Sequence, residues 1–424
     1  MKTLAIIGTG ISGLGCAYFL YERFNLSLFD GNSHAGGHTN TITVDEEGVP
    51  IPIDTGFMVF NRVTYPNLTR MFGELGVGIM PSPMSFSVQH VPSGLEYNGG
   101  SLDLLFGQRR NLLRPRHWRL LAQIDRFNRE ALEGLEDPQY LRHTLREYVE
   151  QRGYGADMLN LYLIPMGAAV WSAPPDRMLD FPAMTLLRFW KNHGFLGLHT
   201  QHPWLTVKGG AKTYVSRLTL PFRDRIALEN RAVRVRREER QATVEFADGT
   251  RRAFDKVILA CHADQALALL ADPTEAEARL LREFRYQPNT ATLHTDPSFM
   301  PRTRRCWASW NYRIDAAPDG SLLPTTHYWM NSLQRVSERR NYFVSLNCHD
   351  RVAPDKVLRR IEYEHPLFTR GAVAAQRELP ALNRISPDQT IYYAGAWFKY
   401  GFHEDGFTSG LECARAITGE TLWN

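Results

Sequence analysis

The feature that constrains this chain most is a glycine-rich hexapeptide near its N-terminus, Gly8-Thr9-Gly10-Ile11-Ser12-Gly13. It follows a short apolar run at residues 4–7, of the kind that is buried in a parallel sheet. An apolar segment with helical spacing follows at residues 14–24, and a second apolar run at residues 26–29 ends on Asp30. This order of strand, glycine loop, helix, strand and acid is typical of a Rossmann-type dinucleotide-binding unit.

Each residue type in this unit has a physical task. Gly8 makes the tight turn, Gly10 lets the backbone approach a pyrophosphate, and Gly13 lets the helix pack on the strand. The pyrophosphate is expected at the helix N-terminus, where free N–H groups and the helix dipole favour anions. Asp30 can accept hydrogen bonds from the ribose hydroxyls. The predicted nucleotide contacts are therefore Gly8, Gly10, Ile11, Ser12, Gly13 and Asp30.

The residues after Asp30 distinguish between dinucleotides. The charge of Asp30 and the lack of an arginine at residues 32–33 disfavour the 2′-phosphate of NADP. A second glycine pair, Gly36-Gly37, suits a chain that passes close beside an extended cofactor, which favours FAD. His38 and Thr39 follow this pair and are predicted as further contacts.

A second glycine-rich region lies near the C-terminus. Residues 390–397 read as a strand that stops at Gly395, and residues 407–414 read as a helix with small residues on one face. The segment between them carries Gly401 and Gly406. A helix whose N-terminus points inward here would stabilise negative charge on the N1–C2=O edge of a reduced flavin.

Composition excludes several other classes of protein. The net charge of +4 over 424 residues is too small to indicate a nucleic-acid partner, and no apolar run approaches the roughly 20 residues of a membrane span. The first 20 residues read as a strand and a helix rather than a signal peptide, so we expect a cytoplasmic protein. The five cysteines form no CxxC pair and no cluster with metal-ligand spacing, so we expect reduced, mostly buried thiols and no metal.

These motifs resemble the flavin amine oxidase superfamily, which includes amine oxidases, protoporphyrinogen oxidase and carotenoid-type desaturases. The matching motifs, in chain order, are Gly8/Gly10/Gly13, Asp30, Gly36-Gly37, Asp54-Thr55-Gly56-Phe57, Lys208-Gly209-Gly210, Asn230-Arg231-Ala232-Val233, residues 254–260, Ala394-Gly395 and residues 401–410. The resemblance implies bound FAD, with the backbone of Val233 at the adenine end. It adds the cofactor contacts Asp54, Thr55, Gly56, Gly395, His403, Glu404 and Asp405.

The strings at residues 36–41, 54–59 and 401–406 are similar to those of a bacterial subgroup of predicted NAD/FAD-binding amine oxidoreductases. That subgroup is associated with the modification of membrane fatty acids. It includes proteins similar to the methyl-branched fatty-acid desaturase of furan fatty-acid synthesis. The resemblance implies an apolar, acyl-type substrate.

The chain departs from the amine oxidase pattern at several positions. Ala396 stands where the family has a glutamate after Gly395, and His38 stands where an arginine often follows the glycine pair. Phe402 replaces the tyrosine that forms half of an aromatic cage in amine oxidases, which weakens the amine interpretation. No cysteine lies between Cys348 and Cys413, so the FAD is expected to be non-covalent.

We predict an α/β fold in which a Rossmann-type FAD-binding domain is interleaved with an α+β substrate domain of helices and an antiparallel sheet. The FAD-binding parts are residues 1–61, 206–280 and 386–424. The substrate domain comprises residues 62–205, largely helical, and 281–385, which contain alternating stretches at 325–330 and 341–346. The predicted substrate-pocket residues are Phe57, Trp171, Trp329 and Phe402.

Basic and apolar residues alternate at residues 109–121, where five arginines are interleaved with Leu112, Leu113 and Trp118. Such segments lie on anionic membranes, which predicts a peripheral membrane contact. The alternative is a solvated helix whose apolar side faces the core.

The sequence as a whole predicts an FAD-dependent oxidoreductase that dehydrogenates a small or lipid-like apolar substrate. His403 and Glu404 are the candidate catalytic residues, with a structural role in the turn as the alternative. Only one dinucleotide fingerprint is present, so oxygen, a quinone or a carrier protein is expected to reoxidise the flavin. The competing functions are an amine oxidase, an NAD-dependent dehydrogenase and a non-catalytic flavoprotein.

Overall fold

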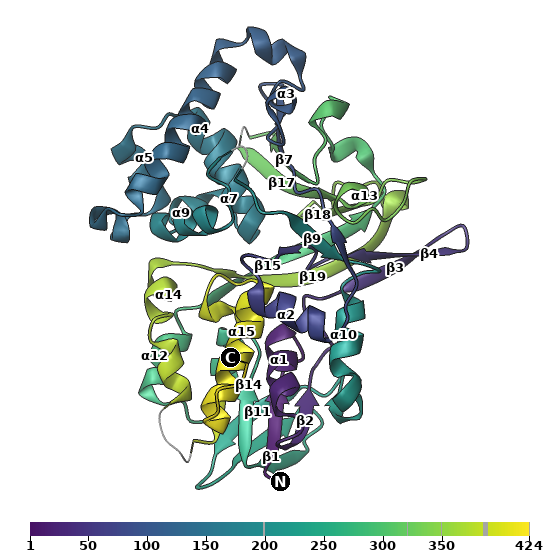
Figure 1. Ribbon diagram of the computed structural model, residues 1–424, viewed down its shortest axis with the longest axis vertical. Helices are drawn as coiled ribbons and strands as arrows, with labels where there is room; N and C mark the ends of the chain where they lie inside the picture. The colour runs from purple at the N-terminus through teal and green to yellow at the C-terminus, as the bar shows by residue number, and fades with distance from the viewer. Residues whose placement is uncertain (198–199, 320, 349, 385–388, 424) are drawn as a thin grey trace.

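The computed structural model describes residues 1–197, 200–319, 321–348, 350–384 and 389–423. Figure 1 shows two lobes stacked along the long axis of the molecule. The lobe with the N-terminus contains a parallel sheet with its helices, and the other lobe contains a second, larger sheet covered by helices. This mixed architecture confirms the predicted α/β fold.

The first sheet is built from three stretches that are far apart in the sequence. Its five strands follow the order β10-β2-β1-β14-β20, and all neighbouring pairs are parallel. Their bounds are Ile226–Ala227 (β10), Asn25–Phe29 (β2), Thr3–Ile7 (β1), Lys256–Leu259 (β14) and Ile391–Tyr393 (β20). The C-terminal strand β20 therefore pairs with β14, one strand away from β1.

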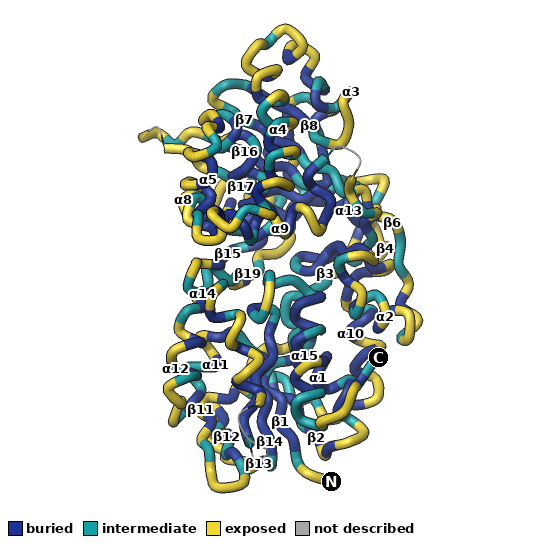
Figure 2. Tube along the Cα trace, turned by 60° about the vertical axis from the view of Figure 1, so that its left-hand side comes forward, coloured by how far each residue is buried: buried dark blue, intermediate teal, exposed yellow. Residues whose placement is uncertain are grey.

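Both faces of this sheet are buried, because alternate residues of β1 belong to different cores. Leu4 and Ile6 pack in the cluster that contains helices α1 (Ile11–Leu20) and α15 (His403–Thr418). Ala5 and Ile7 pack in a second cluster, beneath the three-stranded sheet β11-β12-β13. Its strands are Ala232–Arg237, Ala242–Phe246 and Arg251–Phe254. Figure 2 shows the buried strands running through this lobe.

Helices α1 and α15 approach each other very closely. A Cβ atom on Gly410 would lie 2.7 Å from the carbonyl oxygen of Ser12, and one on Gly15 would lie 3.1 Å from the ring of Phe407. The small residues predicted on one face of the C-terminal helix therefore pack against the helix of the glycine loop.

The second sheet has seven strands in the order β19-β15-β18-β17-β16-β7-β8. The bounds are Val357–Leu367 (β19), Arg285–His294 (β15), Phe343–Leu346 (β18), Leu322–Trp329 (β17), Trp310–Ala316 (β16), Phe86–His90 (β7) and Leu95–Asn98 (β8). The predicted antiparallel sheet forms the larger part, but β16 pairs in parallel with β7. Strands β7 and β8 come from a stretch that was predicted to be largely helical. They pair with each other, and β7 also pairs with β16, which would otherwise be the exposed edge of the sheet.

Helices and short strands complete the molecule. Within residues 62–205, which were predicted to be largely helical, the longest helix is α4 (Pro115–Gly134). It is followed by α5 (Leu145–Arg152), which begins at a capping box between Thr144 and Glu147. The other helices are Pro66–Glu74 (α2), Leu102–Leu105 (α3), Ala156–Met158 (α6), Ile164–Trp171 (α7), Pro175–Leu179 (α8), Ala183–Asn192 (α9), Lys212–Thr219 (α10), Ala263–Leu269 (α11), Glu275–Leu281 (α12), Met330–Leu333 (α13) and Arg370–Ala375 (α14). The remaining strands are Thr41–Glu46 (β3), Val49–Asp54 (β4), Phe60–Asn61 (β5), Ile79–Pro81 (β6) and Trp204–Val207 (β9).

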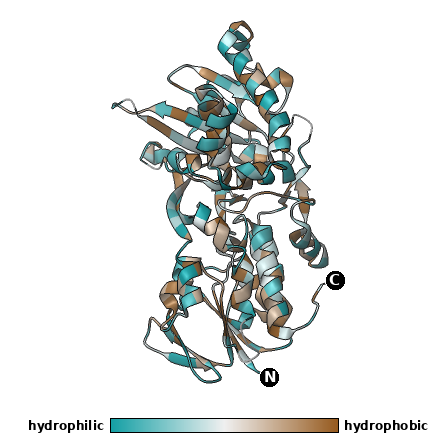
Figure 3. Ribbon diagram, turned by 90° about the vertical axis from the view of Figure 1, so that its left-hand side faces the viewer, coloured by the Kyte–Doolittle hydropathy of each residue, from teal (hydrophilic) through white to brown (hydrophobic). Residues whose placement is uncertain are grey.

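Hydrophobic and hydrophilic residues are interspersed along the chain in both lobes, as Figure 3 shows. Within the described residues, no helix has the combination of length and hydropathy that crossing a membrane requires.

Candidate active site and cofactor cradle

At two of the three glycines in the first loop, the packing of the protein backbone alone leaves no room for a side chain. Gly8 has φ +107°, and a Cβ atom there would lie 2.6 Å from the carbonyl oxygen of Ala260. A Cβ atom on Gly13 would lie 2.0 Å from the carbonyl oxygen of Gly8. These two positions accept no side chain whether or not a ligand is bound.

Gly10 is different, because no described atom outside its own neighbours lies within 4 Å of the position that its Cβ atom would take. It is the N-cap of α1 and has an ordinary φ of −66°. The first turn of α1 consists of uncharged residues, so the positive end of the helix dipole is not neutralised there. The missing side chain therefore leaves space at a helix N-terminus, which fits the approach of a pyrophosphate.

The second glycine pair lies against the first loop. Gly36 donates its N–H to the carbonyl oxygen of Thr9 at 2.9 Å and forms a parallel bridge with Gly10. A Cβ atom on Gly37 would lie 3.1 Å from the Cα atom of Gly10. The two motifs, which are separated by more than 20 residues, thus form one cradle.

Asp30 lies at the end of β2, where it is also part of the loop structure. Its Oδ2 accepts hydrogen bonds from the N–H and the hydroxyl of Thr9, at 2.8 and 2.6 Å. Its Oδ1 accepts from the N–H and the side-chain amide of Asn32, each at 2.9 Å. The carboxylate is only half-buried, so its outer side remains available to a ribose hydroxyl.

The motif that contains Val233 lies beside Asp30, because the N–H of Asn230 donates to the carbonyl oxygen of Asp30 at 2.8 Å. The register of the β11–β12 pair shifts at Val233, between Ala232 and Arg234. A bulged residue is left out of the ladder. Val233 is also 43% exposed, so its backbone is accessible at the predicted adenine end.

His38 follows the glycine pair and belongs to a histidine cluster that sequence reasoning did not find. Its ring stacks on Tyr363 with centroids 5.0 Å apart, and His365 and His262 lie at 5.4 and 6.2 Å. Burial, reinforced by His262, lowers the pKa of His38 to about 4. The residue is therefore neutral at pH 7, unlike the arginine of the related proteins. Tyr363 and His365 lie far from any recognised motif, and His262 lies just outside the motif at residues 254–260, so no sequence signal marked the cluster.

Asp54 connects three elements rather than facing open space. Its carboxylate accepts hydrogen bonds from the Thr41 hydroxyl at 2.5 Å, from the N–H of Ala211 at 2.9 Å and from the Gln334 amide at 2.5 Å. Burial raises the pKa of Asp54 to about 6. The next residue, Thr55, lies 2.9 Å from the Tyr363 hydroxyl, which ties this turn to β19.

Gly56 continues this turn beside the second glycine pair. A Cβ atom there would lie 2.1 Å from the carbonyl oxygen of His38, which also accepts the N–H of Phe57 at 2.9 Å. The close approach of these two backbones explains the glycine. Residues 38–39 and 54–57 are consequently brought together on one side of the cradle.

The closing motif lies against residues 39 and 57, and its two carboxylates have structural partners. Glu404 accepts hydrogen bonds from the N–H groups of Asn67 and Leu68, at 3.0 and 2.9 Å, in the first turn of α2. Asp405 accepts from the N–H groups of Phe402 and Tyr400, at 3.0 and 3.2 Å. This geometry supports the structural alternative for Glu404, because both of its oxygens cap a helix.

Gly395 and His403 are positioned by hydroxyl groups. The N–H of Gly395 donates to the Ser409 hydroxyl at 2.9 Å. Nε2 of His403 lies 2.8 Å from the Thr39 hydroxyl, which lies 2.5 Å from that of Tyr214. Burial holds the pKa of His403 well below its usual range, so its imidazole is neutral.

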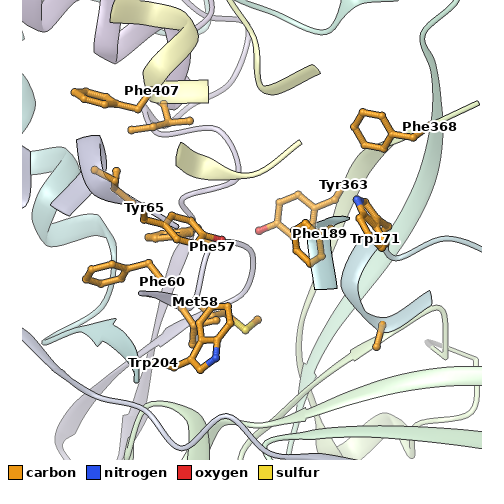
Figure 4. Packing of buried hydrophobic residues seen from close by; sticks show 14 of the residues in the cluster. Phe57, Met58, Phe60, Tyr65, Trp171, Phe189, Trp204, Tyr363, Phe368 and Phe407 are labelled. Carbon is orange, nitrogen blue, oxygen red and sulfur yellow. The ribbon is translucent and has the colours of Figure 1, made fainter. Parts of the chain in front are cut away.

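An aromatic cluster lies beside the start of α15. Phe189 stacks on Phe402 with centroids 5.0 Å apart, and Trp171 lies 6.3 Å from Phe402. The indole of Trp171 donates to the carbonyl oxygen of Tyr400 at 3.3 Å. Figure 4 shows Phe189 and Trp171 close together, apart from Phe57, which lies with Met58 and Phe60. Phe189 was not predicted, although its place on the amphipathic helix α9 marks it as buried.

The structure does not bring Trp329 to this cluster. Adjacent residues of β17 point to opposite faces of the sheet, and the ring of Tyr328 packs at 5.3 Å against Trp310. Trp329 packs against Trp307 with centroids 5.3 Å apart, beneath the guanidinium of Arg304. The four predicted pocket residues therefore occupy three places, and only Trp171 and Phe402 lie together.

Comparisons with known proteins agree with this geometry. The family model of flavin-containing amine oxidoreductases matches residues 11–418. Among solved structures, putrescine oxidase bound to putrescine has a TM-score of 0.68 at 14% identity, with 99% of each chain covered. Cyclohexylamine oxidase from Brevibacterium oxydans has a TM-score of 0.67 at 16% identity, with 98% of each chain covered.

A conjugated linoleic acid (CLA)-producing fatty acid isomerase from P. acnes has a TM-score of 0.65 at 14% identity, with 96% of this chain and 97% of that chain covered. A comparison with curated protein sequences finds no significant match. Identities of 14–16% show a shared fold, whereas the family model spans almost the whole sequence. The cradle fits FAD, and the chain belongs to the family of flavin-containing amine oxidoreductases, as an FAD-dependent oxidoreductase.

Proposed function

We propose that this enzyme dehydrogenates an apolar substrate, a fatty-acyl chain, with FAD as the acceptor of the hydride. The observation that supports this most is the uncharged aromatic cluster of Trp171, Phe189 and Phe402 beside the start of α15. His193 stacks on Phe189 with centroids 3.9 Å apart, and burial lowers its pKa to about 4. The cluster therefore offers neutral rings to a substrate.

The side chains at the start of α15 have positioning tasks in this proposal. Glu404 and Asp405 are bound by backbone N–H groups, so they hold α2 and the 400–402 turn rather than a charged substrate. Both residues also lie in the first turn of α15, where they offset the positive end of the helix dipole. Burial among aromatic rings excludes water from the reacting carbon. Bound FAD supplies the redox chemistry, and oxygen, a quinone or a carrier protein is proposed to reoxidise it.

A second candidate is oxidation of an amine. The faces of Trp171 and Phe402 could receive an alkylamine, and a neutral amine needs no carboxylate partner. Two of the similar structures are named for putrescine and cyclohexylamine, and a third for a fatty acid isomerase. Phe402 favours the acyl candidate because a phenyl ring lacks the hydroxyl group of the amine oxidase tyrosine.

We further propose that the acyl substrate reaches the enzyme from a membrane. The turn Arg109–Leu113 and the first turn of α4 expose apolar side chains, with Leu113 at 87% and Trp118 at 51% exposure. The same segment carries five arginines, and each is worth about 1 kcal/mol on an anionic surface. Arg109 and Arg116 are also paired with Asp103 and Asp157, so attraction should be reversible and sensitive to salt.

The substrate proposal is tested by anaerobic mixing of the flavin-loaded enzyme with dispersed acyl phospholipids and, separately, with primary amines. Loss of the visible flavin band is expected with the acyl substrate. A Phe402→Tyr variant, which restores the residue of amine oxidases, should keep the acyl reaction. Bleaching by amines alone would favour the amine oxidase candidate instead.

Membrane delivery is tested by co-sedimentation with anionic vesicles at low salt. The test variant changes Arg109, Arg110, Arg114, Arg116 and Arg119 to Gln. The matched control changes the same number of exposed arginines in the other lobe, Arg223, Arg225, Arg234, Arg236 and Arg251. The test variant alone should lose vesicle binding. Equal pelleting of both variants with the wild type would contradict membrane delivery through this segment.

A further inference from the structure

Three histidines from distant segments of the chain meet beside the glycine loop: His38, His262 and His365. The first of them follows Gly37, where a Cβ atom would lie 3.1 Å from the Cα atom of Gly10. The second lies shortly after Ala260, whose carbonyl oxygen would lie 2.6 Å from a Cβ atom on Gly8. The third lies on β19, which runs along the boundary between the two lobes in Figure 1. The cluster is therefore next to the N-terminus of α1, where the pyrophosphate of FAD is expected.

Apart from the helix dipole, the cradle itself offers no positive charge to an anion. Its two glycine motifs, residues 8–13 and 36–39, contain no lysine and no arginine. Asp30, at the end of β2, adds a carboxylate to the same loop. The three imidazoles are each half-buried, so each ring keeps some accessible surface. Among the side chains of the two motifs and the cluster, only an imidazole can become a cation.

A chain of hydrogen bonds keeps His365 neutral. The N–H of Thr290 donates to Oδ1 of Asn347 at 3.0 Å, and the side-chain nitrogen of Asn347 donates to Oδ1 of Asn289 at 2.7 Å. The side-chain nitrogen of Asn289 then donates to Nδ1 of His365 at 2.9 Å. Nδ1 is thus an acceptor, and the proton of the neutral ring is on Nε2. His365 cannot take up a second proton without breaking this chain.

His38 is the imidazole that remains free to take up a proton. Burial and the neighbouring His262 lower its pKa to about 4, although the backbone carbonyl of Glu364, which accepts a hydrogen bond from the ring, raises it. The second ring nitrogen of His38 has no hydrogen-bond partner among the described residues, and it is not sealed from solvent. By contrast, Nδ1 of His262 is sealed, at 3.3 Å from the carboxylate of Glu364. The free nitrogen of His38 is therefore where the cluster can bind a proton and donate it to an anion.

The groups around the cluster allow one positive charge and oppose a second. Beside the three histidines, the titratable side chains that face it are Tyr363 and Glu364 on β19, Tyr286 on β15, Asp264 on α11 and His403 on α15. Burial lowers the pKa of the histidines beside the two carboxylates, and the carboxylates raise it. The rings of His38 and His262 lie 6.2 Å apart, so a proton on one lowers the pKa of the other. An anion beside His38 favours its charged form and raises its pKa.

We propose that His38 takes up a proton when FAD binds, and that the imidazolium donates a hydrogen bond to the pyrophosphate in place of the arginine of related proteins. At neutral pH the proton is absent from the flavin-free protein and present in the complex. Binding and protonation are therefore linked, and the affinity for FAD falls as pH rises through the pKa that His38 has in the complex. The cradle acquires its cation only together with the cofactor that it holds.

Titration calorimetry measures this proton directly. Flavin-free protein is titrated with FAD at about pH 6 in two buffers of different ionisation enthalpy, and the difference in heat gives the number of protons bound. The wild type should take up most of a proton at this pH. Its Kd for FAD should rise about tenfold between about pH 6 and about pH 8. A Kd that is constant with pH, together with a heat that is the same in both buffers, would overturn the proposal.

Two variants of His38 identify the group that binds the proton. His38→Gln keeps a donor for the carbonyl oxygen of Glu364 but cannot become a cation. It should take up no proton, and at about pH 6 it should bind FAD only as tightly as the wild type does at about pH 8. His38→Arg carries its charge permanently, so it should bind FAD tightly at both pH values without proton uptake.

The matched control is His34→Gln, which changes an exposed histidine of the same loop and should behave as the wild type. Thermal melting of each flavin-free variant shows that it is folded before titration. If His38→Gln does not fold, His38→Arg still decides the question. Proton uptake that persisted in a folded variant of His38 would place the proton on another group and overturn the assignment.

Discussion

The imidazole of His403 lies face to face with the ring of Phe57, with centroids 3.7 Å apart and an angle of 14° between the planes. Phe57 follows β4 and His403 begins α15, so the stack joins the first and last parts of the chain. Thr39 holds the same imidazole by a hydrogen bond of 2.8 Å. A neutral, stacked and hydrogen-bonded ring has the features of a positioning residue.

His403→Phe should keep the stack and lose the hydrogen bond to Thr39. We expect the free energy of unfolding to fall by about 0.5–1.5 kcal/mol, the net value of one hydrogen bond. His403→Ala should cost more because the stack is lost as well. Chemical denaturation of the flavin-loaded protein measures both effects. A His403→Phe variant of normal stability that bound flavin yet was not reduced by substrate would make His403 a chemical participant.

Gly10 and Gly13 should respond differently to alanine. Gly10→Ala places its methyl group in open space, so thermal stability of the flavin-free protein should be unchanged while flavin occupancy collapses. Gly13→Ala places a methyl group 2.0 Å from the carbonyl oxygen of Gly8, so folding itself should fail. Thermal melting and the flavin-to-protein absorbance ratio distinguish the two. Full flavin occupancy in Gly10→Ala would place the pyrophosphate elsewhere.

Asp30→Ala should weaken FAD binding by about 1–3 kcal/mol, as expected for hydrogen bonds to a charged group. The reason is the loss of the ribose acceptor together with the bonds that fix Thr9. Asp248→Ala is a suitable control, because Asp248 is exposed in a turn of the same lobe and accepts the N–H of Thr250 at 2.9 Å. Titration of flavin-free protein with FAD should show an effect only for Asp30.

Burial raises the pKa of Asp405 from 3.8 to about 7. A carboxyl group whose pKa is higher in the folded state stabilises that state at low pH, and this contribution is lost as pH rises. The stability of the wild type should therefore fall relative to that of Asp405→Asn between about pH 4 and pH 7. Urea denaturation across this range measures the difference. A difference that stays constant with pH would show that Asp405 does not titrate in this window.

Local patterns predicted the cofactor cradle well, because its chemistry is carried by short motifs. The first strand has almost the bounds that the apolar run indicated, whereas the helix at residues 11–20 begins and ends earlier than the predicted 14–24. Gly36-Gly37 lies against Gly10. The positions of glycines predict where two backbone segments approach closely, because a side chain there would prevent the contact. Spacing within a motif then determines the fold of that motif directly.

Contacts between segments that are far apart in the chain were harder to predict from the sequence. The parallel pairing of β7 with β16 joins segments more than 200 residues apart, and neither segment alone indicates its partner. Trp329 and Tyr328 are adjacent aromatic residues of one strand, and only the register decided which of them faces the helices. The cluster of His38, His262 and His365 has the same origin, since three distant segments supply it.

The contact between α1 and α15 has a consequence for biosynthesis. The helix of the glycine loop precedes the helix that covers it by nearly 400 residues, so it is synthesised well before its partner. At about 5–20 residues per second, roughly 20–80 seconds separate the two. During that time the face of α1 that packs against α15 is uncovered, so chaperones can bind it in the nascent chain. Flavin incorporation should therefore wait until α15 has been synthesised.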